Sequence, residues 1–148
     1  MVGKQSLFTI GYEGADQADF IARLRADNIT LLADLRELPL SRKAGFSKHA
    51  LANALQAHGI DYLHIRELGC PRRIRARYRQ DHDWNHYSED FTRYLATQNR
   101  ALETLAQLAA RQSTALMCFE ADAARCHRSI VAAALHRTHA FTIVDLAP

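Results

Sequence analysis

The sequence predicts a single three-layer α/β/α domain over residues 1–148, with a mostly parallel five-stranded sheet of Rossmann-like form. Short apolar runs alternate along the chain with amphipathic stretches of about ten or more residues, a pattern typical of βαβ units. A length of 148 residues, 48% of them hydrophobic and 24% charged, fits one globular domain with an ordinary core.

The first half of the chain holds three predicted strands and two predicted helices. The strands are apolar runs that end in glycine or charged residues, and they cover residues 7–10, 31–36 and 61–65. Apolar residues at helical spacing predict helices over 16–28 and 47–57. Residues 37–46 contain proline and glycine, which favours a loop.

The second half begins with residues 72–87, which are rich in arginine and aromatic residues and have the least regular pattern of the chain. A long helix is predicted over 87–111 because leucines recur along one face. A strand over 115–120, a helix over 126–139 and a last strand over 141–146 complete the fold.

Side chains with reactive or hydrogen-bonding groups follow the predicted strands at their carboxyl ends. Parallel sheets bind ligands beyond this edge, so we expect these residues to form one site. The predicted catalytic residues are Asp34, Cys118, Glu120, Cys126 and His127. The predicted substrate-binding residues are Gly11, Tyr12, Arg36, Ser41, Arg42, Gly69 and Arg128.

The segment 118–128 is the most informative part of the sequence. It places a thiol and a carboxylate at a strand end, and a second thiol, an imidazole and a guanidinium at a helix start. A helix N-terminus favours anions and thiolates, so Cys126 is expected to have a lowered pKa. Three cysteines in a chain without a secretory pattern argue for free, metal-binding or reactive thiols rather than a disulfide framework.

Four blocks of sequence carry a resemblance to a known family. They are Thr9-Ile10-Gly11-Tyr12-Glu13-Gly14, Asp34-Leu35-Arg36 with Pro39 and Ser41-Arg42, Leu68-Gly69 with Pro71, and Cys118-Phe119-Glu120 through Cys126-His127-Arg128-Ser129. In order and spacing, from about residue 7 to residue 146, they resemble the family called domain of unknown function 488. The resemblance implies a compact α/β protein with these signature residues, and it supplies no activity.

A fainter likeness concerns mechanism. Asp34-Leu35-Arg36 at one strand end and Cys118 at another are similar to the layout of rhodanese-type sulfurtransferases and cysteine phosphatases, which hold a catalytic cysteine in an anion-binding loop. The sequence departs from that pattern, because the positions six residues after Cys118 and Cys126 are Ala124 and Ala132 rather than arginine.

The leading functional hypothesis is an enzyme, or a degenerate enzyme, that acts on a phosphate-bearing substrate such as a nucleotide or nucleic acid. Arg36, Arg42 and Arg128 would hold the anion, because guanidinium groups offer bidentate donors. Glu120 or Asp34 would be the general base, and Cys126 and His127 would orient or activate.

Two further hypotheses use other residues. Thiol chemistry would employ Cys118 or Cys126 as a nucleophile or persulfide carrier, and a redox pair would need their Cα atoms within about 7 Å. A non-catalytic nucleic-acid-binding module would use the arginines of 72–79, which could equally cover a small anion as a lid or form an ordinary solvated surface.

The sequence gives weaker indications about metal binding, partner charge and cellular location. Cys118, Glu120, Cys126 and His127 include zinc ligand types, but their spacing matches no common zinc pattern, so neither metal nor cofactor is expected. The net charge of +3 and pI near 8.9 favour an anionic partner only slightly. No secretory or membrane-spanning stretch is present, so we expect a cytoplasmic location; the oligomeric state stays open.

Overall fold

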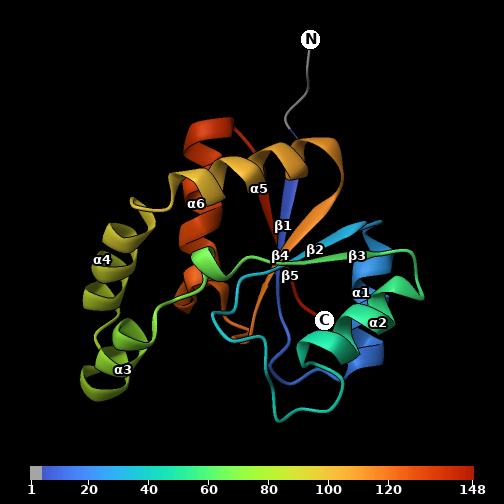
Figure 1. Ribbon diagram of the computed structural model, residues 1–148, viewed down its shortest axis with the longest axis horizontal. Coiled ribbons are helices and arrows are strands. Elements are labelled where there is room, and N and C mark those ends of the chain that lie inside the picture. Colours follow the sequence, from blue (N-terminus) through green and yellow to red (C-terminus); the bar gives the residue numbers. More distant parts are fainter. Residues whose placement is uncertain (1–4) are drawn as a thin grey trace.

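Five parallel strands form the central sheet of the computed structural model, which describes residues 5–148 (Figure 1). Their order across the sheet is β3-β2-β4-β1-β5. The strands are β1 (Ser6–Gly11), β2 (Leu31–Asp34), β3 (Asp61–His64), β4 (Thr114–Cys118) and β5 (Thr142–Leu146). The sequence prediction of a mostly parallel five-stranded sheet is confirmed, and β2 and β4 each end two residues earlier than predicted.

Helices cover both faces of the sheet and form the predicted three layers (Figure 1). They are α1 (Gln17–Ala26), α2 (Lys48–Gln56), α3 (Arg72–Asp81), α4 (Trp84–Leu95), α5 (Asn99–Arg111) and α6 (His127–His139). Side chains of α1 and α2 share one core with Met117, whereas side chains of α4, α5 and α6 share the other with Leu116. These neighbours in β4 separate because successive strand residues point to opposite faces. Within residues 5–148, no helix has both the length and the apolar character needed to cross a membrane.

The prediction of irregular structure over 72–87 is wrong, because α3 occupies most of it. Five arginines leave this helix with few apolar residues, so its helical spacing is hard to recognise in the sequence. Ile74 and Tyr78 nevertheless lie one turn apart, and both contact the core. Pro71 directly precedes the first helical residue, which is a known helix-start signal.

The single long helix predicted over 87–111 is also wrong. The chain forms α4 and α5 instead, separated by residues 96–98. At the break, the Thr97 hydroxyl donates to the Tyr94 carbonyl oxygen at 2.6 Å and so satisfies a group that a continuous helix would have bonded. As a result α3 and α4 pack together as a helical hairpin beside the carboxyl edge of the sheet (Figure 1).

The connections leave neighbouring strands toward opposite faces. β1 and β4 are paired, with Gly11 beside Cys118, yet β1 continues into α1 on one face and β4 into α6 on the other. Such a divergence opens a crevice at the carboxyl edge of a parallel sheet, where ligands of α/β proteins bind.

Two predicted substrate-binding glycines have a packing role at this edge. A Cβ atom on Gly11 would overlap the carbonyl oxygen of Glu120, and a Cβ atom on Gly69 would overlap the backbone of Glu37. Glycine at these positions lets the loop after β4 and the loop after β2 approach their neighbours closely.

We expect Gly11→Ala to lower the free energy of unfolding by about 3 kcal/mol, because the added methyl meets backbone that cannot move alone. The matched control is Gly59→Ala, where φ is +72° and no atom crowds the position, so only the backbone conformation costs about 1 kcal/mol. Urea denaturation measures both. Equal losses in the two variants would contradict the close-approach explanation.

Candidate functional site

A pocket of about 520 Å³ opens at the carboxyl edge of the sheet. Its walls come from the ends of β1, β2 and β4, from the loop after β2, from α3 and from the loop before α6. Six of the predicted site residues line it: Tyr12, Arg36, Ser41, Cys118, Glu120 and His127. The pocket therefore gathers half of the twelve predicted site residues, and its lining also includes residues that were not predicted.

Asp34 and Arg36 form a buried ion pair at the end of β2. Arg36 donates from Nε to Asp34 Oδ1 at 2.9 Å and from Nη2 to Asp34 Oδ2 at 2.7 Å. The remaining Asp34 acceptor capacity is used by the Tyr62 hydroxyl at 2.5 Å and by the Arg36 backbone N–H at 3.1 Å. Asp34 is completely buried and fully engaged, so its geometry is that of a structural anchor rather than of a free general base.

Arg36 is nearly as fully used as its partner. Its Nη1 donates to the Phe46 carbonyl oxygen at 2.7 Å and to the Tyr12 hydroxyl at 3.2 Å. Burial lowers the pKa of Arg36, but the hydrogen bonds and charge of Asp34 outweigh it and raise the pKa above its ordinary value. Four of the five guanidinium N–H groups are thus engaged within the protein.

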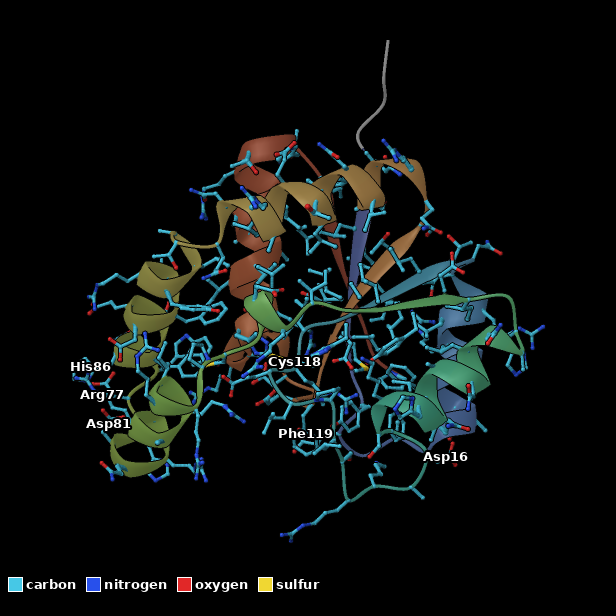
Figure 2. The ribbon with its side chains drawn as sticks, in the orientation of Figure 1. Asp16, Arg77, Asp81, His86, Cys118 and Phe119 are labelled. Carbon is cyan, nitrogen blue, oxygen red and sulfur yellow. A yellow bond between two sulfur atoms is a disulfide. The ribbon has the colours of Figure 1, made fainter. Side chains whose placement is uncertain are left out.

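Cys118 and Cys126 are brought together behind the pocket floor. Cys118 ends β4 and lines the pocket, and Cys126 caps α6 by accepting from the Arg128 backbone N–H at 3.4 Å. The two sulfur atoms form a disulfide, with Cα atoms 7.5 Å apart. The Cα separation is slightly longer than the limit of about 7 Å that was stated above for a redox pair, although the two sulfur atoms are bonded. Figure 2 shows Cys118 near the centre of the molecule and Phe119 below it on the following loop.

Arg128 lies behind the thiol pair and does not line the pocket. It is completely buried, and its Nη1 donates to Cys118 Sγ at 3.0 Å and to the Glu120 carbonyl oxygen. Within residues 5–148, no carboxylate oxygen lies within 4.0 Å of its nitrogens, and its buried Nε has no acceptor. Cys118 is thus the one group of potential negative charge that this guanidinium contacts.

His127 is buried beside the pair, and its hydrogen bonds define its tautomer. Nε2 lies 2.6 Å from the Leu35 carbonyl oxygen, which can only accept, so Nε2 carries the proton and Nδ1 presents a lone pair. That Nδ1 lies 3.8 Å from Cys126 Sγ. Burial lowers the pKa of His127 to about 4, so the ring is neutral near pH 7.

Glu120 faces the same thiol from the loop after β4. Its Oε2 lies 3.4 Å from Cys126 Sγ, and a Cys126 thiol would donate to it. Burial of the carboxyl raises the pKa of Glu120 above its ordinary value, although the residue as a whole is exposed. A carboxyl with a raised pKa is better matched to proton transfer near neutral pH than an ordinary one.

The same cluster contains metal-ligand types. Cys118, Cys126 and His127 each offer a ligand atom, and these atoms lie within 4.8 Å of one another. In the dithiol form the set could hold a thiophilic ion such as Zn²⁺. The Arg128 guanidinium, 3.0 Å from Cys118 Sγ, places a positive charge beside that position and so favours a bare thiolate over a cation.

The structure separates the three arginines proposed as an anion clamp. Arg36 lines the pocket, Arg128 is buried behind it, and Arg42 is exposed on the loop after β2 outside the lining. The arginines that do line the pocket with Arg36 are Arg75, Arg79 and Arg125. Sequence reasoning missed Arg75 and Arg79 as site residues because it did not assign a helix to α3, on which their spacing of four puts them on one face.

The remaining arginines of α3 point elsewhere. Arg77 contacts Asp90 at 3.1 Å and Asp81 at 3.5 Å on the outer side of the α3–α4 hairpin. Figure 2 shows Arg77, Asp81 and His86 together at the outer edge of the molecule, away from Cys118. The arginine-rich 72–79 segment is therefore divided between two helix faces.

The fold and pocket define a doubly wound α/β protein with its candidate site at the carboxyl edge, where adjacent strands diverge. The family model described as domain of unknown function DUF488 matches residues 16–135, and the chain belongs to this family. No match was found among curated proteins or among solved structures.

His127 should make stability depend on pH. Its pKa of about 4 in the folded protein is below the usual 6.5, so the unfolded chain binds the extra proton between these values. Stability from this residue is complete above pH 6.5 and falls by about 3 kcal/mol as the pH drops to 4.

The variant His127→Gln keeps a donor for Leu35 but removes the titration. Urea unfolding of both proteins at several pH values isolates the difference, since all other groups are shared. The wild-type protein should lose more stability than the variant across pH 6.5 to 4, and parallel curves would show that His127 is not buried in its neutral form.

Proposed function

We propose that this protein is an enzyme of thiol chemistry, in which Cys118 is the nucleophile and Cys126 the resolving thiol. The observation that supports it most strongly is the completely buried Arg128 guanidinium, whose Nη1 lies 3.0 Å from Cys118 Sγ and which has no carboxylate within 4.0 Å among the described residues.

A buried cation is unfavourable unless an anion compensates it, because the desolvation of each ion costs several kcal/mol. The backbone carbonyls of Glu120 and Ala121 supply dipoles to Arg128 but no charge. A Cys118 thiolate would supply the charge, and Arg128 would in return lower the pKa of that thiol. The pairing favours a nucleophile poised at the pocket floor.

The neighbours of Cys126 suit a second step. In the dithiol form the Cys126 S–H donates to Glu120 Oε2. The neutral His127 ring also borders the sulfur, with its Nδ1 3.8 Å from Cys126 Sγ. Glu120, with its raised pKa, is the better acceptor of the thiol proton, whereas His127 remains neutral and positions the sulfur. Cys126 thus has a local base, which a resolving thiol requires.

The reaction that follows uses a substrate with an electrophilic sulfur, R–S–S–R′. The Cys118 thiolate attacks one sulfur, a Cys118–S–S–R bond forms, and R′–S⁻ leaves. Cys126 then loses its proton to Glu120 and attacks Cys118 Sγ, which forms the Cys118–Cys126 disulfide and releases R–S⁻. The substrate is reduced by two electrons, and an external dithiol restores the enzyme. With a sulfane sulfur donor R–S–SH, the Cys118 thiolate attacks the outer sulfur, the S–S bond of the donor breaks, R–S⁻ leaves, and the first product is a Cys118 persulfide.

The geometry gives less support to a phosphate-processing reaction. Asp34 is fully engaged, and Arg36, Arg42 and Arg128 do not converge on one point in the pocket. A nucleic-acid-binding module working through 72–79 stays a prediction, with its arginines divided between two faces of α3.

The reduced protein should show one rapidly alkylated thiol at neutral pH, and that thiol should be Cys118. We expect its apparent pKa in iodoacetamide alkylation to be below the ordinary 8.5 because of Arg128. Cys70 lines the same pocket and serves as an internal control, since burial raises its pKa to about 11. At pH 7, Cys118 should react at least about tenfold faster than Cys70 when the sites are read by mass spectrometry.

Arg128→Met should move the apparent pKa of Cys118 to 8.5 or above, with circular dichroism as a check of folding. If Arg128→Met does not fold, Cys126→Ser still reports the Cys118 pKa with the guanidinium in place. A Cys118 that reacts no faster than Cys70 in the wild-type protein and in Cys126→Ser would overturn the proposal.

Resolution by Cys126 can be observed with the neutral disulfide 4,4′-dithiodipyridine. The wild-type protein should release two equivalents of thiopyridone from the Cys118–Cys126 pair and retain no adduct there, whereas Cys126→Ser should release one and keep a pyridylthio group on Cys118. Cys70→Ser is the matched control and should behave as the wild type. A stable Cys118 adduct in the wild-type protein would contradict the resolving role.

A further inference from the structure

The mouth of the pocket is apolar on one side. Leu38, Leu40 and Phe119 are 53%, 69% and 45% exposed, and within residues 5–148 they are the large hydrophobic side chains that are left exposed. All three line this pocket. Phe119 also meets the Tyr12 ring edge-on at 5.3 Å, which holds it at the rim. Apolar exposure confined to a cavity mouth points to an apolar part of a ligand.

The mouth also carries arginines without acidic partners. Arg79 reaches the pocket from α3 and Arg125 from the turn before α6, and among the described residues neither forms an ion pair. Arg75 donates from Nη2 to Glu37 at 2.7 Å, while its buried Nε has no acceptor in the described part of the chain. Two elements far apart in the sequence thus direct guanidinium groups to one cavity.

The charges of the lining leave this side positive. The carboxylates that line the pocket are Glu37, which is paired with Arg75, and Glu120, which forms no ion pair among the described residues. Arg36 is neutralised by Asp34, so Arg79 and Arg125 exceed the single carboxylate of Glu120 by one positive charge. A positive cleft raises the local concentration of anions and their rate of encounter.

The position of the thiol decides the size of the occupant. Cys118 is only 1% exposed and borders a cavity of about 520 Å³, a volume typical of small-molecule sites. A ligand must enter this cavity to meet the sulfur, which the flat surface of a second protein does not do.

We propose that the pocket selects small amphiphilic anions, whose carboxylate, sulfonate or phosphate group binds Arg79 and Arg125 and whose aromatic or other apolar part packs on Leu38, Leu40 and Phe119. This inference rests on the proposed thiol function and names the substrate class for it: a disulfide or sulfane sulfur compound that combines an anionic and an apolar group. In this proposal the residues at the pocket mouth select the substrate, and Cys118 and Cys126 carry out the reaction.

The reaction test compares four disulfides on the reduced protein, with each Cys118 rate divided by the rate of N-acetylcysteine under the same conditions. They are 5,5′-dithiobis(2-nitrobenzoate), aromatic and anionic; 4,4′-dithiodipyridine, aromatic and neutral; dithiodiglycolate, aliphatic and anionic; and cystamine, aliphatic and cationic. The normalised rate should be highest for the aromatic anion, about tenfold or more above that of cystamine, and the preference should shrink as salt is added.

Variants assign the preference to residues. In the double variant Arg79→Gln with Arg125→Gln, the ratio of the rate with the aromatic anion to the rate with 4,4′-dithiodipyridine should fall about tenfold or more. Arg77→Gln is the matched control, because Arg77 lies on the other face of α3, and it should keep the preference. Leu40→Ser should reduce the advantage of the aromatic anion over dithiodiglycolate.

Binding of an unreactive probe separates this inference from the thiol function. The Cys118→Ser variant should bind 2-naphthalenesulfonate in calorimetry, and the added Arg79→Gln and Arg125→Gln changes should weaken that binding about tenfold or more. Normalised rates that are independent of charge, or probe binding that survives the arginine changes, would overturn the selection of anions alone. Cys118 that is inert toward all four disulfides, with probe binding intact, would overturn the thiol function and leave the anion site standing.

Discussion

The buried pair of Asp34 and Arg36 is the interaction on which the site depends. It lies at the end of a central strand and connects that strand to Tyr12 after β1, to Tyr62 in β3 and to the Phe46 carbonyl in the loop after β2. A buried ion pair stabilises only if its remaining hydrogen bonds are made, and here the carboxylate oxygens and nearly all guanidinium donors are satisfied. The pair therefore holds several strand ends and one pocket wall in a fixed arrangement.

A second buried arginine lies on the other side of the same crevice, and it is satisfied differently. Arg128 has two backbone carbonyls and a cysteine sulfur as partners, and no carboxylate in contact among the described residues. Arg36 has its counter-charge in direct contact, whereas the carboxylates of Asp145, Glu120 and Asp122 act on Arg128 only from a distance. This contrast underlies the proposal that the Arg128 guanidinium, unlike that of Arg36, influences the charge of a neighbouring thiol.

The fold could be predicted from the sequence, and so could the gathering of polar side chains at the carboxyl edge of the sheet, because apolar alternation and strand-end residues are local signals. The roles of Asp34 and Arg128 could not be predicted in this way, since each depends on which hydrogen bonds are already occupied in three dimensions. The prediction of irregular structure over 72–87 failed for a different reason, because the arginines of this segment hide the apolar face of α3. Only the helix shows that Arg75 and Arg79 face the pocket while Arg77 does not. Gly11 and Gly69 were predicted as substrate-binding residues, and their packing role could not be seen without the opposing backbone.

These constraints form one chain of dependence that ends at the thiol. Gly11 lacks a side chain, so the Glu120 carbonyl can approach β1 and reach the Arg128 guanidinium. That carbonyl and the burial of Arg128 hold Nη1 beside Cys118, while the Arg128 backbone N–H holds Cys126 at the start of α6. The position of the guanidinium beside the sulfur is thus supported by backbone at the end of β1 and in the loop after β4. A charge placed by backbone in this way is preorganised, and preorganised charge is what lowers a thiol pKa without further rearrangement during a reaction.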